Sequence, residues 1–326
     1  MNRKEDCLDL RQNCKSSRYL PEFAVSNDDL SQIMETSDEW IKTRTGISSR
    51  RISQQENTSD LAIQVAKQLL AGEDPAGVDL IIVATMSPDA YTPATAALVQ
   101  AAVGAENAAC FDLSAACSGF VYALDVAEKM LRRPGGMALV IGAETLSKLV
   151  DWQDRTTAVL FGDGAGGVLI KNDALEPHFL ASQLKSYGHL AKFLSAGQTS
   201  PQPFPGPVTG LAPFKMNGRE VYKFATHKVP EVITACLEEA GVGLAEVDLF
   251  LLHQANYRII KQVARRLDLP EEKFPCNIAE YGNTSAASEA ILLAGLAEEG
   301  KAQAGDLVVL AGFGGGLTAA AQLVRL

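Results

Sequence analysis

The sequence lacks the long apolar runs of a membrane protein, because none of its 326 residues belongs to an uninterrupted apolar stretch of 18 or more. No membrane-spanning helix is therefore predicted. The first 18 residues are polar and mixed in charge, without the apolar core of a signal peptide, and their acidic residues argue against a transit peptide. We expect a cytoplasmic protein.

Metal-binding and disulfide patterns are also missing. The six cysteines include no Cys-x-x-Cys pair, and the four histidines are scattered, with neither His-Glu-x-x-His nor mixed Cys/His spacing. A chain of this size needs no disulfides to fold, and no zinc site is predicted. The formal net charge of −10 disfavours general nucleic-acid binding, so that an acidic partner would need a local basic patch.

Short apolar runs alternate with longer helices rich in small residues along most of the chain. This alternation predicts mainly parallel sheets covered by helices. The expected strands are Leu80–Thr85, Ala138–Ile141, Val159–Phe161 with Gly167–Ile170, Leu249–Leu252 and Leu307–Leu310. The expected helices are Asp28–Thr36, Asp60–Leu70, Ala94–Val103, Cys117–Leu131, Tyr222–Ala240, Tyr257–Leu267 and Ser285–Glu299.

The second half of the sequence repeats features of the first in a common register. Val78-Asp79-Leu80 recurs as Val247-Asp248-Leu249, Ala127-Glu128 as Ala297-Glu298, and Ala138–Ile141 as Leu307–Leu310, at offsets of 169 or 170 residues. The shared offset indicates a duplicated α/β unit. We expect an N-terminal half over residues 1–180 and a C-terminal half over residues 181–326.

A proline-rich stretch lies between the regular elements. Ser195–Pro213 holds five of the 14 prolines, which prevents a regular helix or strand. A loop of this length is either a functional cover over a site or a tolerated excursion, and the sequence favours neither.

Cys117 stands where a β-type run ending near Leu113 gives way to helical periodicity. This position places the sulfur on the first turn of a helix, where unpaired N–H groups and the helix dipole favour a thiolate. The small neighbours Ala115, Ala116, Ser118 and Gly119 would let a substrate approach. A free cysteine is more often a small buried apolar residue, which is how we interpret the other five.

Two further polar residues follow buried segments in the second half. His253 comes directly after Leu249–Leu252, at the strand end where α/β sheets place ligands. Asn283 lies in a turn that the offset makes the approximate counterpart of the Cys117 turn. The alternatives are a satisfied core histidine and an N-cap asparagine.

Two glycine-rich segments differ in what they predict. Gly312-Phe-Gly-Gly-Gly316 follows the last predicted strand and could expose a backbone N–H as an oxyanion donor, or simply form a tight turn. Gly162–Gly167 fits G-x-G-x-x-G, but a strand follows it where a dinucleotide site needs a helix. We interpret that segment as a turn between buried strands.

Together these segments closely resemble the β-ketoacyl-acyl carrier protein synthase III family, from about Tyr19 to the C-terminus. The resemblance implies the thiolase fold, a duplicated α/β unit in five αβαβα layers, and agrees with the internal offset. The matching motifs are Thr36-Ser-Asp-Glu-Trp40-Ile-Lys-Thr-Arg44-Thr-Gly-Ile, Ala115-Ala-Cys117-Ser-Gly-Phe, Asp154-Arg155, Phe161-Gly-Asp-Gly-Ala-Gly, His253-Gln-Ala-Asn256, Gly282-Asn283-Thr-Ser-Ala-Ala-Ser and Gly312-Phe-Gly-Gly-Gly.

The resemblance further implies a decarboxylative Claisen condensation that initiates fatty-acid synthesis. An acyl-CoA primer, typically acetyl-CoA, would acylate Cys117, and malonyl-acyl carrier protein would supply the enolate. His253 and Asn283 would donate hydrogen bonds to the enolate, and the N–H groups of Cys117 and Gly315 would hold the tetrahedral oxyanion. The resemblance implies no metal or redox cofactor, and it implies a homodimer.

Binding residues follow from the same resemblance. Trp40 and Arg155 would sandwich the adenine of CoA, with Arg44 and Asn256 beside them. Arg258, Lys261 and Arg265 share one face of a helix, with Arg266 at its edge, and would meet the acidic carrier protein. The alternative is an ordinary solvated helix face.

The sequence departs from the family pattern at several positions. The N-terminal segment around Leu8 is polar, so the first strand could be altered or frayed. Thr92 stands where phenylalanine is common, which implies a roomier primer pocket for longer or branched primers. Ala319 replaces a common tryptophan, and Glu289-Ala290 replace an apolar-Pro pair.

Three rival functions remain open from the sequence. A thiolase-fold acyltransferase or condensing enzyme of secondary metabolism would share Cys117, His253 and Asn283 but use another acceptor. A papain-like protease also runs Cys, His, Asn along the chain, but its cysteine lies near the mature N-terminus. An inactive scaffold paralogue would not need all three positions filled.

Overall fold

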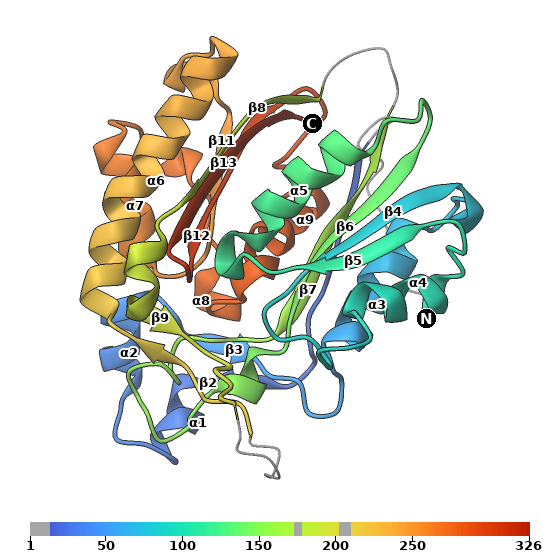
Figure 1. The fold of residues 1–326 in the computed structure, drawn as a ribbon. Coiled ribbons are helices and arrows are strands. Elements are labelled where there is room, and N and C mark those ends of the chain that lie inside the picture. Colours follow the sequence, from blue (N-terminus) through green and yellow to red (C-terminus); the bar gives the residue numbers. More distant parts are fainter. Residues whose placement is uncertain (1–13, 173–177, 202–209) are drawn as a thin grey trace.

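The computed structural model describes residues 14–172, 178–201 and 210–326. Two β-sheets enclose a pair of central helices, and further helices cover the outer face of each sheet (Figure 1). The five αβαβα layers expected from the sequence are therefore confirmed. Among the described residues, no helix combines the length and the apolar character needed to cross a membrane.

The first sheet has the strand order β1-β7-β6-β4-β5. β4 (Val78–Ala84) pairs in parallel with β5 (Ala109–Leu113) and with β6 (Met137–Glu144). β7 (Gly164–Lys171) is antiparallel to β6 and to β1 (Cys14–Tyr19), which closes one edge of the sheet. β1 is thus a regular edge strand, while the polar segment around Leu8 lies outside the described residues.

The second sheet has the order β11-β12-β13-β8. β11 (Leu249–Leu252) is parallel to β12 (Leu307–Gly314), whereas β13 (Thr318–Arg325) is antiparallel to β12 and to β8 (Phe179–Ser186). The prediction of mainly parallel sheets was therefore wrong. Only residues 315–317 join β12 to β13, too few for the crossover that parallel pairing needs.

The strand residues alternate between two hydrophobic layers. Ile82 of β4 faces the central cluster, while Ile81 and Val83 face the outer cluster on the first sheet. The central helices are α5 (Gly119–Met130) and α9 (Ser288–Glu298), and α9 is buried along nearly its whole length. The outer helices are α3 (Thr58–Leu69) and α4 (Thr95–Val103) on the first sheet, and α6 (Gly218–Ala240) and α7 (Tyr257–Arg266) on the second.

The two halves repeat one topology. The strand order β1-β7-β6-β4 of the first sheet corresponds to β8-β13-β12-β11 of the second. A short 3-10 turn precedes each central helix, η2 (Ala116–Ser118) before α5 and η7 (Ser285–Ala287) before α9. We propose a division of the chain near residue 180, because β8 is the first strand of the second sheet.

The glycine-rich segment Gly162–Gly167 differs from its predicted turn. Gly164 already begins β7, and only Phe161 of the predicted strand before it pairs, through an isolated parallel bridge to Asn283. A Cβ on Gly166 would come within 2.5 Å of the backbone nitrogen of Ile291. Glycine is required here because the strand packs directly on the backbone of α9.

Smaller elements gather at one end of the two sheets (Figure 1). The predicted helix Asp28–Thr36 ends early at Ser31, and α2 was not predicted. β9 and β10 pair across the proline-rich stretch, whose residues 202–209 lie outside the described residues. These elements are β2 (Ala24–Ser26), α1 (Asn27–Ser31), α2 (Asp38–Thr45), β3 (Ser49–Arg51), β9 (Leu194–Ser195), β10 (Lys215–Met216) and α8 (Ile278–Tyr281).

Candidate active site

Cys117 occupies the middle of η2, between β5 and α5, and is 6% exposed. The residue before it, Ala116, has a φ of 47°, in the left-handed region that residues with a Cβ rarely adopt. The end of β12 packs on this turn so closely that a Cβ on Gly314 would lie 2.6 Å from the backbone nitrogen of Cys117. The glycine-rich strand end therefore reaches the cysteine backbone.

His253 follows β11 and is fixed on two sides. Its backbone N–H donates to the Ala311 carbonyl at 2.8 Å, and its Nδ1 lies 2.7 Å from Ser288 Oγ. Burial lowers the pKa of the imidazole to about 3, so the ring is neutral at physiological pH. A neutral imidazole has one N–H to donate, and its other nitrogen must accept a hydrogen bond.

Asn283 is held by the bridge to Phe161 and by its own side chain. Its backbone N–H donates to the Leu160 carbonyl, and Oδ1 accepts the Ser285 N–H, both at 2.8 Å. With Oδ1 occupied inside the turn, the Nδ2 amide is the group left for the cavity.

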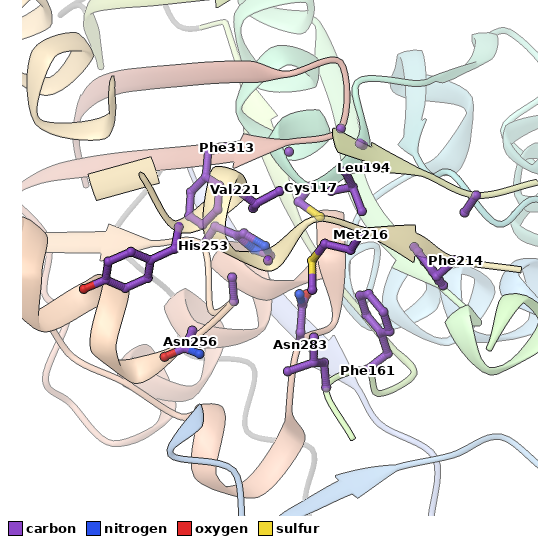
Figure 2. Close-up of a pocket in the computed structure, with 18 of the residues that line it drawn as sticks. Cys117, Phe161, Leu194, Phe214, Met216, Val221, His253, Asn256, Asn283 and Phe313 are labelled. Carbon is purple, nitrogen blue, oxygen red and sulfur yellow. The ribbon is translucent and has the colours of Figure 1, made fainter. Parts of the chain in front are cut away.

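The three side chains open into a single cavity of about 470 Å³. Figure 2 shows Cys117, His253 and Asn283 converging on it from three different segments of the chain. Its far wall is apolar and includes the rings of Phe161 and Phe214, stacked with centroids 4.1 Å apart. The sequence therefore named three residues that the tertiary structure brings together.

The resting state of the cysteine differs from the sequence-based expectation. Burial raises the pKa of the Cys117 thiol to about 12, the nearby Ser285 hydroxyl opposes this shift, and the carboxyl groups of Glu144 and Glu289 add to it. The thiol, rather than the thiolate, is thus the resting form. Desolvation in the enclosed cavity outweighs the helix start.

Comparison with known proteins decides the family. The family model of 3-oxoacyl-[acyl-carrier-protein] synthase III matches residues 111–188, and the model of the C-terminal part of that family matches residues 237–326. A β-ketoacyl-[acyl-carrier-protein] synthase III of Lactobacillus delbrueckii subsp. bulgaricus is 98% identical over 312 residues, which is 96% of this chain and 98% of the relative. A β-ketoacyl-[acyl-carrier-protein] synthase III of Limosilactobacillus reuteri is 54% identical over 93% of this chain and 95% of the relative.

The chain belongs to the β-ketoacyl-acyl carrier protein synthase III family. Its activity is that of a condensing acyltransferase that initiates fatty-acid synthesis. The solved 3-oxoacyl-[acyl-carrier-protein] synthase III of Aquifex aeolicus matches with a TM-score of 0.88 and 45% identity, over 95% of this chain and 98% of that one. The solved priming β-ketosynthase of the R1128 polyketide pathway matches with a TM-score of 0.89 and 34% identity, over 95% of this chain and 94% of that one. The family, fold and enzyme class predicted from the sequence are confirmed, and the protease alternative is excluded.

The synthase III residues expected to bind CoA lie together at the mouth of the cavity. The guanidinium carbon of Arg44 is 4.5 Å from the centre of the Trp40 ring, and that of Arg155 is 5.4 Å from it. The Asn256 Nδ2 donates to the Arg44 carbonyl at 3.0 Å. Trp40, Arg44 and Asn256 line the cavity, whereas Arg155 contacts it through Trp40.

The basic residues of α7 line its exposed face near this mouth. Arg258 donates to the Thr43 carbonyl, Lys261 pairs with Glu271 at 3.3 Å, and Arg266 lies 2.9 Å from His227 Nε2. Arg265, for which the described residues provide no ion-pair partner, is exposed.

Thr92 does not line this cavity. It is exposed, in the loop between β4 and α4. The described residues contain no cluster of three or more side chains positioned for a metal ion.

Several cavity residues were not predicted from the sequence. Leu194 and Met216 enter the wall because β9 pairs with β10, and Phe214 immediately precedes β10. They flank the proline-rich stretch, so its position was the only sequence signal for them. Ser288 is the partner of His253, and nothing local marks it except its place in the Asn283 motif.

Proposed function

We propose that Cys117 carries the acyl primer of a decarboxylative condensation between acyl-CoA and malonyl-acyl carrier protein. The observation that carries this proposal is the convergence of Cys117, His253 and Asn283 in one cavity whose mouth holds Trp40 and Arg44. The chemistry is thioester exchange, loss of CO₂ to give an enolate, and attack of that enolate on a thioester, and none of these steps changes an oxidation state that a redox cofactor would have to balance or requires a metal.

The first half-reaction transfers the primer to Cys117. The sulfur attacks the thioester carbonyl of acyl-CoA, the bond to the CoA sulfur breaks, and CoA leaves with the proton that the thiol gives up. The pKa of about 12 makes loss of that proton part of the transfer rather than a prior step. The N–H groups of Cys117 and Gly315 hold the tetrahedral oxyanion, a role supported by the packing of β12 on η2.

The second half-reaction forms the carbon–carbon bond. The malonyl group loses CO₂, and the electron pair of the broken bond forms an enolate at the thioester. His253 Nε2–H and Asn283 Nδ2–H donate to the enolate oxygen, which requires neutral donors held in place beforehand. The enolate carbon attacks acyl-Cys117 and the bond to the cysteine sulfur breaks, which yields a 3-oxoacyl-carrier protein. The released thiolate takes up one proton from the solvent.

The adenine of CoA would lie between Trp40 and Arg155, whose contact in the substrate-free chain it would replace. An aromatic ring and a guanidinium plane both stack on a base. The basic face of α7, formed by Arg258, Lys261, Arg265 and Arg266, would receive the acidic carrier protein beside this entrance.

We propose a cytoplasmic homodimer that forms through the edge strand β5. Residues 110–113 are only partly buried in the single chain and border no further strand in the described residues. Asp112 of β5 accepts the N–H groups of Thr95 and Ala96 at 2.7 and 2.8 Å, which ties this edge to the loop carrying Thr92. Thr92 would then reach the primer pocket of the partner subunit, where its small side chain leaves room for longer or branched primers.

Intact mass after mixing with a panel of acyl-CoAs tests the proposal. We expect an acyl adduct on the protein and on a Cys276→Ser control, since Cys276 is an exposed residue that does not line the cavity, but none on Cys117→Ala. Adding malonyl-carrier protein should then consume the adduct and give a 3-oxoacyl product. An adduct without that product would contradict the acceptor and favour a related condensing enzyme of secondary metabolism.

A further inference from the structure

Glu289, in the first turn of α9, is a fully buried carboxyl group behind the catalytic histidine. Its Oε2 lies 3.1 Å from Ser288 Oγ, and its Oε1 has no hydrogen-bond partner in the described part of the chain. Gly312 of β12 makes room for it, since a Cβ there would come within 2.7 Å of Oε1. The site is therefore shaped around this side chain, yet Ser288 is the one side chain in the described part of the chain that hydrogen-bonds to it.

The surroundings of Glu289 favour its neutral form. The titratable groups around it are Cys117 of η2 and His253 after β11, with Glu144 of β6 beyond Cys117. None of these carries a positive charge at neutral pH. Burial raises the pKa of Glu289 to about 8, opposed by hydrogen bonds from its own backbone and from Ser288. A carboxyl group buried without a cation stays protonated at pH 7.

Ser288 connects this carboxyl group to His253. Its Oγ lies 2.7 Å from His253 Nδ1, 2.9 Å from the Ser285 carbonyl, and 3.3 Å from the Gln254 N–H. A hydroxyl has one proton to donate and two lone pairs to accept with. When Glu289 is protonated, its O–H and the Gln254 N–H fill both lone pairs.

The proton of Ser288 then has one satisfactory destination. Suppose that the Ser288 proton went to the Ser285 carbonyl instead. A protonated Nδ1 would then be a third donor to an oxygen with two lone pairs, and an unprotonated Nδ1 would place its lone pair against that oxygen at 2.7 Å with no proton between them. Donation to Nδ1 gives both Ser288 Oγ and His253 Nδ1 a partner, and it leaves the imidazole proton on Nε2, facing the cavity. An ionised Glu289 would instead accept the Ser288 proton, draw the imidazole proton to Nδ1 and leave a lone pair on Nε2.

We propose that Glu289, as a neutral acid, selects through Ser288 the Nε2–H tautomer of His253. Glu289 is thus a positioning residue for the condensation half-reaction. The inference rests on the proposed role of His253 as an enolate donor. It makes condensation sensitive to ionisation of a residue that does not line the cavity.

The ¹⁵N chemical shifts of His253 test the tautomer in the intact protein. In histidine-labelled protein at pH 7, with His253 assigned by its loss in His253→Asn, we expect a protonated Nε2 and an unprotonated Nδ1. Raising the pH through about 8 should exchange the two signals. Glu289→Gln, whose amide still donates to Ser288 but cannot ionise, should keep the Nε2–H form throughout. Glu299→Gln, at the exposed end of the same helix, should behave like the parent.

A kinetic measurement on protein preloaded at Cys117 checks the consequence. Above the transition, condensation with malonyl-carrier protein should fall by roughly 10²-fold, the usual effect of losing one oxyanion donor. Glu289→Gln should remove this fall, and preloading the protein keeps any change in the loading of Cys117 out of the measurement. A protonated Nδ1 at pH 7, or a Glu289→Gln profile identical to the parent, would overturn the inference. Loading and product formation at pH 7 test the proposed function separately, so the two failures are distinguishable.

Discussion

Ala116 and Ser285 hold the same left-handed backbone conformation, with φ values of 47° and 49°, at equivalent points of the two halves. Each begins the 3-10 turn that leads into a central helix, and the two turns pack against each other. A residue with a Cβ costs about 1–2 kcal/mol in this conformation. The fold thus holds strain directly beside Cys117 and Asn283, where packing from both halves maintains it.

Replacing Ala116 with glycine should test this strain. Glycine adopts the left-handed conformation without a steric cost, which stabilises the folded state. It also gives the unfolded chain more conformational entropy, which opposes this gain, so the free energy of unfolding should change by less than about 1 kcal/mol. Ala101→Gly, at an exposed position of α4, should lower it by about 1 kcal/mol. Urea denaturation measures the free energy of unfolding of both variants. A fall in Ala116→Gly as large as in Ala101→Gly, or larger, would contradict the strain at Ala116.

Trp40 should contribute to acyl-CoA binding rather than to the chemistry. We expect Trp40→Leu to raise KM for acyl-CoA roughly tenfold, because a stacked ring is worth about 1–3 kcal/mol to a base, and to leave kcat nearly unchanged. Trp152→Leu, at the other tryptophan, removes a ring outside the cavity and should leave KM unchanged. Steady-state loading kinetics decide this, and an equal fall of kcat in Trp40→Leu would count against a binding role.

Thr92 should limit the size of the primer. A Thr92→Phe substitution would fill space in the partner's pocket, so loading of branched primers should fall by about tenfold or more, while acetyl loading changes little. Tyr91→Phe, a conservative change at the neighbouring exposed residue, should have no effect. Competition between acetyl-CoA and isobutyryl-CoA, measured by intact mass, gives the ratio of branched to acetyl primer loaded on the protein. Unchanged ratios in Thr92→Phe would show that Thr92 lies away from the primer.

Glu73 should stabilise the edge of the first sheet above acidic pH. Its carboxylate pairs with Lys15 of β1 at 2.7 Å and Lys171 of β7 at 2.9 Å. Burial opposes ionisation, but the two ammonium groups lower the pKa of Glu73 below its ordinary value. A lowered folded-state pKa gives stability that is complete above the unfolded value of about 4.3 and is lost as pH falls through the folded value.

Glu73→Gln should therefore destabilise the protein at pH 7 and flatten the loss of stability on acidification. Urea denaturation between about pH 6 and pH 3 measures how steeply the free energy of unfolding falls as the pH is lowered. Glu106→Gln, at an exposed glutamate outside every ion pair of the described residues, should keep the parent slope. A parent-like slope in Glu73→Gln would contradict the assigned cause.

Local pattern predicted most of the elements that surround the site. β11 begins and ends where its apolar run does, and α7 differs from its predicted end by one residue. β8 and β13 were missed because their sequences carry no clear alternation. β8 is a strand through pairing with the distant β13, and β13 lies between β8 and its neighbour in sequence, β12. Gly164–Gly166, at the start of β7, were predicted as part of a turn, since only the backbone of α9 shows why a strand there contains glycine.

The sequence by itself determined the family, the duplicated fold and the three residues Cys117, His253 and Asn283, because motifs and a common offset are properties of order along the chain. Only the tertiary structure decided how those residues behave. The thiol of Cys117 resists ionisation because segments from both halves exclude water from it. The tautomer of His253 depends on Ser288 and Glu289, which approach it only when α9 packs beside β11. Desolvation and hydrogen-bond geometry depend on enclosure, and enclosure exists only once distant segments have packed together.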